Sequence, residues 1–333
     1  MTVEIRRPVV RLTAVGMSAA IVVARTVFII FDAITTLAAN VISIVITWKT
    51  LEFAEMTKIF ATSLALADLC VGVLVSFSVV PSAVGRWLYG DVMCRIIGVM
   101  GTSFAMISVL SLLCVSADRY TAVTRPLRYY GLVTRRRAAV ALAVAWLSTI
   151  GANTYLAVKS NFIIYDEVLC ICLPEWGNQE ILPYLVTVCA IWIAVPSVVT
   201  VSIYVQLFRI SRRHARQIAA QAAPAIQGPR SADMRAIRTM FVVTGAFNLA
   251  YMPFLFCNIY LNISNDDLPG ALKFTSMWLA LSNSWWNFFI YLATSKNFRK
   301  TAFKLLCLKC PCVLTARNPN GAALGHANAI VHT

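Results

Sequence analysis

Seven separate stretches of apolar residues, each long enough to cross a lipid bilayer as a helix, dominate this sequence. About 20 apolar residues in a helix span the roughly 30 Å hydrocarbon core of a membrane. The segments are Ala20–Thr47, Ile59–Ser82, Val92–Thr121, Ala138–Val158, Ile181–Phe208, Ala236–Leu261 and Ala271–Thr294. Only 13% of the residues are charged, whereas a soluble domain carries about 25%, so a large soluble helical protein is disfavoured. The sequence predicts an all-α membrane protein built as a seven-transmembrane helix bundle.

Charge separates the connections between these segments into two sets. The basic set contains Lys49, Lys58, Arg125, Arg128, Arg135, Arg136, Arg137, Arg209, Arg212, Arg213, Arg216, Lys296, Arg299 and Lys300. The acidic set contains Asp91, Asp166, Glu167, Glu175, Glu180, Asp266 and Asp267. Basic loops stay in the cytoplasm, which predicts an extracellular N-terminus, a cytoplasmic C-terminus and a multi-pass protein of the plasma membrane. Topology and anionic membrane lipid account for much of the net charge of +15, so no nucleic-acid partner is needed.

The expected organisation is a single bundle with short ends. Residues 1–19 form a short extracellular N-terminus, residues 20–294 the bundle, residues 295–312 an amphipathic segment with a cysteine cluster, and residues 313–333 a disordered cytoplasmic tail. The connection Arg209–Arg235 contains Gly228-Pro229 and is expected to be a flexible loop.

Basic and apolar residues alternate at helical spacing directly after the last span. This segment, which begins at Lys296, is expected to form a short eighth helix on the inner membrane surface. Cys307, Cys310 and Cys312 follow and are candidates for palmitoylation, the alternative being unmodified thiols.

Two acidic residues lie inside predicted spans, where a charge requires a reason. Asp68 is central in the second span, and Asp32 in the first is the lesser case. The expected partners of Asp68 are Asn40, Ser108, Asn283, Ser284 and Asn287. Their spacing favours a hydrogen-bonded core that joins helices. The alternative is a sodium site made by Asp68, Ser108, Asn283 and Asn287.

The third span ends with Asp118-Arg119-Tyr120 at the side predicted to be cytoplasmic. This ionic pair is either an interfacial anchor or half of a switch in which Arg119 contacts Asp233 at the start of the sixth span. Pro196 and Pro253 lie deep in the fifth and sixth spans. Each proline is either a tolerated kink or a hinge.

Two features are expected on the extracellular side. Cys94 is predicted to pair with Cys172, which lies nearer the fifth span than Cys170, although Cys170 stays open as the partner. Asn262-Ile-Ser264 is a glycosylation acceptor whose closeness to the sixth span disfavours its use. The sequence shows no cysteine and histidine spacing typical of a zinc site.

Taken together, an ordered series of residues resembles the rhodopsin-like (class A) G-protein-coupled receptors over about Asn40–Cys312. The matching residues are Asn40, Leu64 with Asp68, Trp87 before Cys94, Asp118-Arg119-Tyr120 with Pro126-Leu127, Trp146, Pro196 with Tyr204, Phe247 with Pro253, Asn287 with Tyr291, and Phe298-Arg299. The resemblance implies a receptor, not an enzyme, that couples to a heterotrimeric G protein by outward movement of the sixth span. It needs no cofactor beyond a candidate allosteric sodium ion.

The resemblance also assigns roles to individual residues. Arg119 leaves Asp233 on activation and approaches Tyr204 and Tyr291, while Leu127 contacts the G protein. A ligand, either a small molecule or a peptide, enters between the third, fifth, sixth and seventh spans. The residues implied at this pocket and its hinges are Gly101, Pro196, Phe247, Tyr251 and Pro253.

The chain departs from the family pattern at three places. Phe288 replaces the usual proline after Asn287, Tyr251 replaces the usual tryptophan, and the fourth span lacks the proline often found toward its outer end. Two further positions narrow the ligand: Gly101 stands where aminergic receptors place an aspartate, and Leu281 where opsins place the retinal-binding lysine. An orphan-like, non-aminergic and non-opsin receptor is therefore predicted. A non-signalling scaffold or decoy is the first alternative, and a transporter is disfavoured because the sequence contains no inverted repeat.

Overall fold

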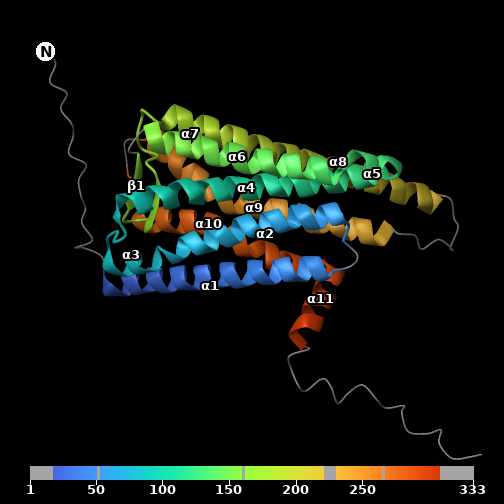
Figure 1. The fold of residues 1–333 in the computed structure, drawn as a ribbon, viewed down its shortest axis with the longest axis horizontal. Helices are drawn as coiled ribbons and strands as arrows, with labels where there is room; N and C mark the ends of the chain where they lie inside the picture. Colours follow the sequence, from blue (N-terminus) through green and yellow to red (C-terminus); the bar gives the residue numbers. More distant parts are fainter. Residues whose placement is uncertain (1–17, 51–52, 160–161, 221–229, 265–266, 308–333) are drawn as a thin grey trace, which may run out of the picture.

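The computed structural model describes residues 18–50, 53–159, 162–220, 230–264 and 267–307. Its elements are α1 (Ala19–Lys49), α2 (Glu55–Ser76), α3 (Val79–Val84), α4 (Gly90–Thr124), η2 (Pro126–Arg128), α5 (Tyr129–Leu132), α6 (Arg135–Lys159), β1 (Ile163–Asp166), β2 (Ile171–Pro174), α7 (Leu182–Cys189), η3 (Ala190–Ala194), α8 (Val195–Ala220), α9 (Arg230–Ile263), α10 (Gly270–Thr294) and α11 (Lys296–Cys307). The long helices lie side by side as one bundle, and α11 turns away from its axis (Figure 1). The seven-helix prediction is confirmed.

Six helical segments of the described chain are long and apolar enough to cross a membrane. The seventh, α10, has 25 residues, but it contains the buried polar residues Ser276, Ser282, Asn283, Ser284 and Asn287. These polar side chains lower the mean hydropathy of α10. They are buried because α10 packs against other helices and not only against lipid. The fifth span is assembled from α7, the π-helical turn η3 and α8, so one residue is inserted just before Pro196.

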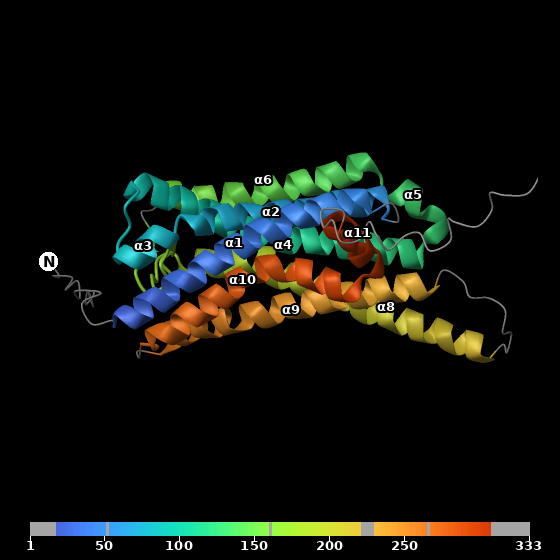
Figure 2. The same cartoon turned by 90° about the horizontal axis from the view of Figure 1, so that it is seen from below.

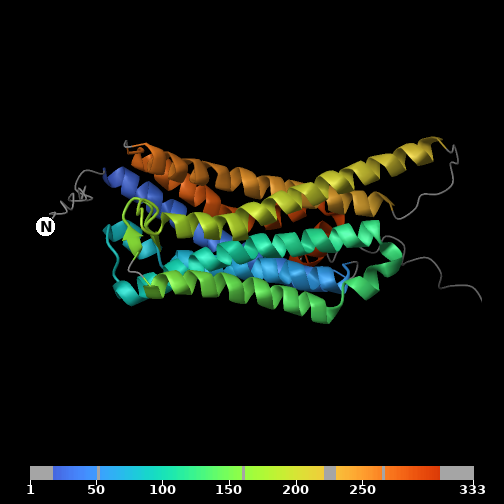
Figure 3. The ribbon, with the colours of Figure 1, turned by 90° about the horizontal axis from the view of Figure 1, so that it is seen from above.

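The two ends of the bundle differ in structure. The end that carries α3 and the β1–β2 hairpin is called the hairpin end, and the opposite end, with α5 and α11, is called the α11 end (Figure 2). At the hairpin end β1 and β2 pair antiparallel, with Tyr165 opposite Cys172. At the α11 end α8 extends beyond most of the bundle (Figure 3).

One expectation about local structure is wrong. The flexible loop predicted from Arg209 begins later, because α8 continues to Ala220 before a stretch outside the described residues. The second span is present as Glu55–Val84, and within it α2 ends at Ser76 and is followed by the short helix α3, which contains Pro81. A proline cannot donate the backbone hydrogen bond that a continuous helix needs.

Candidate functional site

The carboxylate of Asp118 is the centre of a buried polar cluster at the α11 end of α4. It is 1% exposed, and its Oδ2 atom lies 2.6 Å from Nη2 of Arg119. Thr57 on α2 donates a hydrogen bond to the same oxygen at 2.7 Å. The hydroxyl of Tyr129 on α5 donates to Oδ1 at 2.6 Å. Three elements therefore meet at one carboxylate, and Arg119 also donates to Thr57.

Burial is the main cause that raises the pKa of the Tyr129 hydroxyl above its ordinary value, and the hydrogen bond to Asp118 adds to it. The hydroxyl is therefore neutral and can act as a donor to the carboxylate. A buried anion is stable only when such donors satisfy it. The cluster fixes α5 against the end of α4.

The tyrosines of the predicted switch have other partners in the structure. Tyr204 shares a 2.6 Å hydrogen bond with Ser116, and the ring of Tyr291 packs against Phe298 at 5.7 Å between centroids. Tyr120 donates to Gln206 on α8 at 3.0 Å. The approach of Arg119 to the two tyrosines stays a prediction.

Leu127 is fully exposed beside the Asp118 cluster. Its relative exposure is 100%, and that of Tyr130 is 86%. Both residues lie in the short segment that connects α4 to α6. An apolar side chain held out from the bundle end in this way is suited to contact a partner protein.

Four predicted residues fall outside what the structure describes. The side chain of Asp233 does so, although α9 includes its backbone, and the contact with Arg119 therefore stays a prediction. The same holds for the side chain of Cys307 and for Cys310 and Cys312, the candidates for palmitoylation.

Asp68 lies in a second buried cluster at the middle of the bundle. Asn287 on α10 donates to its Oδ2 atom at 2.9 Å, and the side chains of Ser108 and Ser284 are hydrogen-bonded to it. Asn283 is buried on the same helix, at 4% exposure. This arrangement fits a hydrogen-bonded polar core, and sodium binding there stays a prediction.

Asn40 does not bond to Asp68 as expected. Its amide donates instead to the backbone oxygens of Thr36 and Ser284, at 2.9 and 3.0 Å. The second of these bonds joins α1 directly to α10.

The two prolines predicted as hinges lie in different kinds of helix. Pro196 follows the π-helical turn, where the backbone is already irregular, whereas Pro253 lies inside the continuous helix α9. The rings of Phe247 and Tyr251 stack 4.4 Å apart on α9. The helix α10 continues without interruption through Phe288.

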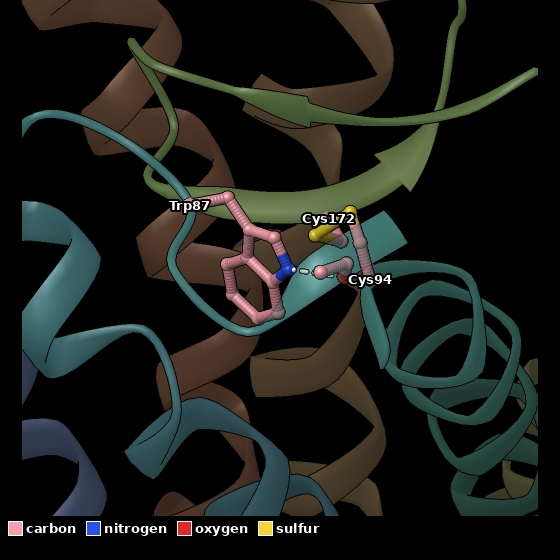
Figure 4. The surroundings of a disulfide bond; sticks show 4 residues. Trp87, Cys94 and Cys172 are labelled. Atoms are coloured by element: carbon pink, nitrogen blue, oxygen red, sulfur yellow. Dashed lines mark hydrogen bonds between the residues drawn. A yellow bond between two sulfur atoms is a disulfide. The ribbon is translucent and has the colours of Figure 1, made fainter. Parts of the chain in front are cut away.

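The hairpin end is closed by the disulfide between Cys94 and Cys172, which confirms the predicted pairing (Figure 4). Beside it, Trp87 donates a hydrogen bond to the backbone oxygen of Gly90 at 2.8 Å. Cys170 is a buried free thiol. Asn262, the candidate glycosylation residue, lies in the last turn of α9, where its amide donates to the Asn258 oxygen at 2.7 Å. That position in a helix disfavours its use.

The hairpin lies deep in the bundle mouth. Every residue of β2 is buried, and the indole of Trp278 on α10 donates to the backbone oxygen of Leu169 at 2.9 Å. Gly98 on α4 makes this approach possible, because a Cβ atom there would lie 2.5 Å from Ile163. At Gly101, one turn further along α4, a Cβ atom would meet only Leu74, at 3.8 Å.

Sequence reasoning missed the residues of neighbouring elements that bind the Asp118 carboxylate. Thr57 and Tyr129 have no spacing that connects them to Asp118. The burial of Trp278 under the hairpin likewise depends on the loop path. One feature of the sequence could have indicated the contact between Trp285 and Asp32, namely an acidic residue in the middle of a span, which needs a polar partner.

Comparison with known proteins decides the family. The model for "7 transmembrane receptor (rhodopsin family)" matches residues 39–291. The chain belongs to this receptor family. The dog histamine H2 receptor is 29% identical over 81% of this chain and 76% of its own. The guinea pig 5-hydroxytryptamine receptor 4 is 28% identical over 75% of this chain and 71% of its own. The squid rhodopsin crystal structure has the same fold, with a TM-score of 0.77 at 18% identity, covering 89% of this chain and 88% of that one.

Membership makes this receptor a G-protein-coupled, multi-pass membrane protein and not an enzyme. The class prediction is thereby confirmed. The prediction of a non-aminergic ligand is not tested by these similarities, and two of the relatives are named for the amines histamine and 5-hydroxytryptamine. The orientation of the termini likewise stays a prediction.

Proposed function

We propose that the receptor couples to a heterotrimeric G protein at the α11 end, which faces the cytosol. The observation that carries this proposal is the buried Asp118–Arg119 pair beside the fully exposed Leu127. The basic residues Arg125, Arg128 and Arg135 lie around this segment. Positive charge of this kind favours a cytoplasmic location and steers the approach of an acidic partner surface.

The inactive arrangement is held by hydrogen bonds from α2 and α5 to the Asp118 carboxylate. Activation moves α9 outward at Pro253 and opens a groove that accepts a segment of the G protein. Arg119 then leaves Asp118, and it also leaves Asp233, the partner that the family resemblance implies. A ligand drives this change only by binding the open state more tightly than the closed one.

The ligand of this receptor is unidentified, and an amine bound in the manner of the family's third-helix aspartate is disfavoured by Gly101. A cavity beside the hairpin has a volume of about 210 Å³ and is lined by Asp166, Glu175, Trp176 and Lys273 among others. The strand β2 is buried in the bundle mouth. This arrangement supports substantial signalling without any added ligand.

Asp233→Ala tests the proposed switch. The variant is expected to raise ligand-free signalling, measured as cyclic AMP, calcium and inositol phosphate at equal surface expression. Ala236→Ser is a matched control at the next turn of the same helix and should leave basal signalling unchanged. Basal levels that stay the same in Asp233→Ala would contradict the switch.

A second candidate function is a receptor-like scaffold that does not signal. It is favoured by Phe288, where α10 continues as an unbroken helix, and by Tyr251. The same panel distinguishes the two functions. A scaffold gives no second-messenger response for the wild type or for Asp233→Ala, whereas a coupled receptor responds in at least one pathway.

A further inference from the structure

A buried acid on α1 lacks a partner for one of its oxygens. Asp32 is 1% exposed and is the fourteenth of the 31 residues of α1, close to the middle of the span. Its Oδ1 atom accepts a hydrogen bond from the Trp285 indole at 2.9 Å, while Oδ2 has no partner within the described part of the chain. Asp32 forms no ion pair with any described residue. A carboxylate at this depth is costly unless a cation or a proton compensates it.

The next turn of α1 contains a second buried oxygen without a hydrogen-bond partner in the described part of the structure. The hydroxyl oxygen of Thr36 is also buried and without a partner among the described residues. Asp32 and Thr36 are four residues apart and therefore lie on one face of the helix. Gly72 on α2 lies against this face, because a Cβ atom there would come within 2.9 Å of Thr36. Two acceptor oxygens thus share one narrow region between α1, α2 and α10.

An aromatic cavity shares the Trp285 side chain with the same carboxylate. It has a volume of about 570 Å³ and is bounded by α1, α9 and α10. Its lining includes Phe28, Phe274, Trp278, Ser282, Trp285 and Trp286. Ligand cavities have volumes of about 300–1,000 Å³, so the space accepts a small organic molecule.

The cavity and the acid are connected through two residues. Trp285 lines the cavity and donates its indole N–H to Asp32, and Phe28 lines the cavity one helical turn before Asp32. The Trp285 side chain therefore belongs to both the cavity wall and the surroundings of the carboxylate, which lies behind the lining and has one unused oxygen. Aromatic faces attract cations, and the carboxylate supplies the complementary charge.

We propose that this cavity binds a lipophilic amine, whose apolar part lies among the aromatic rings and whose ammonium group pairs with Asp32. The site is separate from Gly101 on α4, the position where the resemblance places the aspartate of aminergic receptors. It lies along helices that face lipid, so the amine enters from the bilayer. Binding at this site does not depend on G-protein coupling, and the two proposals can fail separately.

The test uses the purified full-length receptor in lipid nanodiscs. The probe is N,N-dimethylphenethylamine, and its neutral carbon isostere, isopentylbenzene, is compared with it in tryptophan fluorescence titrations. Asp32→Asn keeps the size and the acceptor oxygen but removes the charge. Loss of one partner of a buried charge pair weakens binding by about 30-fold or more. Saturable amine binding is therefore expected in the wild type, with a loss of this size in Asp32→Asn.

Three controls decide between explanations. Asp68→Asn removes another buried acid, in the middle of α2, and should change the amine affinity less than threefold. Trp285→Phe keeps an aromatic wall but lacks the donor to Asp32, and it should still bind the amine. Thermal unfolding of each variant verifies that it is folded.

Two outcomes would overturn the proposal. The first is equal affinity of the wild type and folded Asp32→Asn for the amine. The second is equal affinity of the wild type for the amine and the neutral isostere, which would identify the cavity as a site for neutral lipid only.

Discussion

The hairpin end and the α11 end of the bundle are stabilised by different kinds of contact. At the hairpin end a disulfide, a buried hairpin and the indole of Trp278 bring the loop into the core. At the α11 end a single carboxylate, Asp118, receives hydrogen bonds from α2 and α5 and pairs with Arg119. Covalent and apolar contacts do not reverse easily, whereas hydrogen bonds to a carboxylate can be exchanged.

This difference fits a molecule that changes shape mainly at one end. A packed core moves as a unit between discrete arrangements, so the hairpin end forms the fixed part. The α11 end has few apolar contacts around Leu127 and Tyr130, which are exposed. Substitutions at the first end should therefore alter stability, and substitutions at the second should alter signalling.

The largest effect is expected from loss of the disulfide. Cys172→Ser should lower the free energy of unfolding by about 2–5 kcal/mol and greatly reduce surface expression, measured by thermal unfolding and cell-surface labelling. Cys170→Ser is the matched control, because this thiol is free, and it should keep nearly normal expression. A larger defect for Cys170→Ser than for Cys172→Ser would show that the wrong cysteine has been paired.

A smaller loss of stability is expected at Gly98. Gly98→Ala places a methyl group 2.5 Å from Ile163 and 3.3 Å from the Cys172 oxygen, and overpacking of this kind costs about 1–3 kcal/mol. Gly101→Ala, on the same helix, meets only Leu74 at 3.8 Å and should be nearly neutral. Equal melting temperatures for the two variants in nanodiscs would mean that the hairpin is not packed on α4.

At the α11 end, Asp118→Asn should change activity rather than stability. Without the charge, Arg119 loses its ion pair, so ligand-free signalling should rise. We expect a rise of about fivefold, which corresponds to the weakest of the typical coupling free energies between sites. Tyr129→Phe removes one of the donors and should cause a smaller rise. Both are measured as second messenger at equal surface expression. A decrease of basal signalling in Asp118→Asn would argue against a restraining role for this pair.

The smallest effect is expected from the exposed ion pair at the hairpin end. Lys273 lies 2.5 Å from Asp267, and the hydrogen bond between them lowers the pKa of that carboxyl below its ordinary value. The pair is therefore fully stabilising above the ordinary carboxyl pKa, and its contribution is lost as the pH falls through the lowered value. An exposed pair contributes little.

Asp267→Asn should accordingly lower the melting temperature slightly at pH 7, and this difference from the wild type should shrink toward pH 3. Glu180→Gln, which removes an acid outside the three ion pairs of the described residues, serves as the control. A difference that grows on acidification would show that Asp267 is not stabilised by Lys273.

The helices were predictable from sequence because each span is a long and mostly apolar run of residues. The partners of Asp68 were predictable in part, since polar residues inside a membrane tend to find one another, as Asn287 does. Asn40 was assigned incorrectly, because its amide binds backbone oxygens, which a sequence does not mark as partners.

Tertiary contacts made by loops were not predictable. Tyr129 reaches Asp118 only because η2 and α5 turn back under α4. Trp278 reaches Leu169 only because the hairpin enters the bundle. Neither path leaves a periodic signal in the sequence. The split of the fifth span at η3 was also missed, because a π-helical turn of ordinary apolar residues resembles any other helical turn.

The orientation of the α11 end is the claim on which the proposed coupling depends, and epitope accessibility tests it most directly. An epitope inserted after the exposed Gly131, between α4 and α6, is compared with one fused before Met1. The loop epitope should be labelled only after cells are permeabilised, and the N-terminal epitope on intact cells. Labelling of the loop epitope on intact cells would place Arg119 and Leu127 outside the cell and contradict the account.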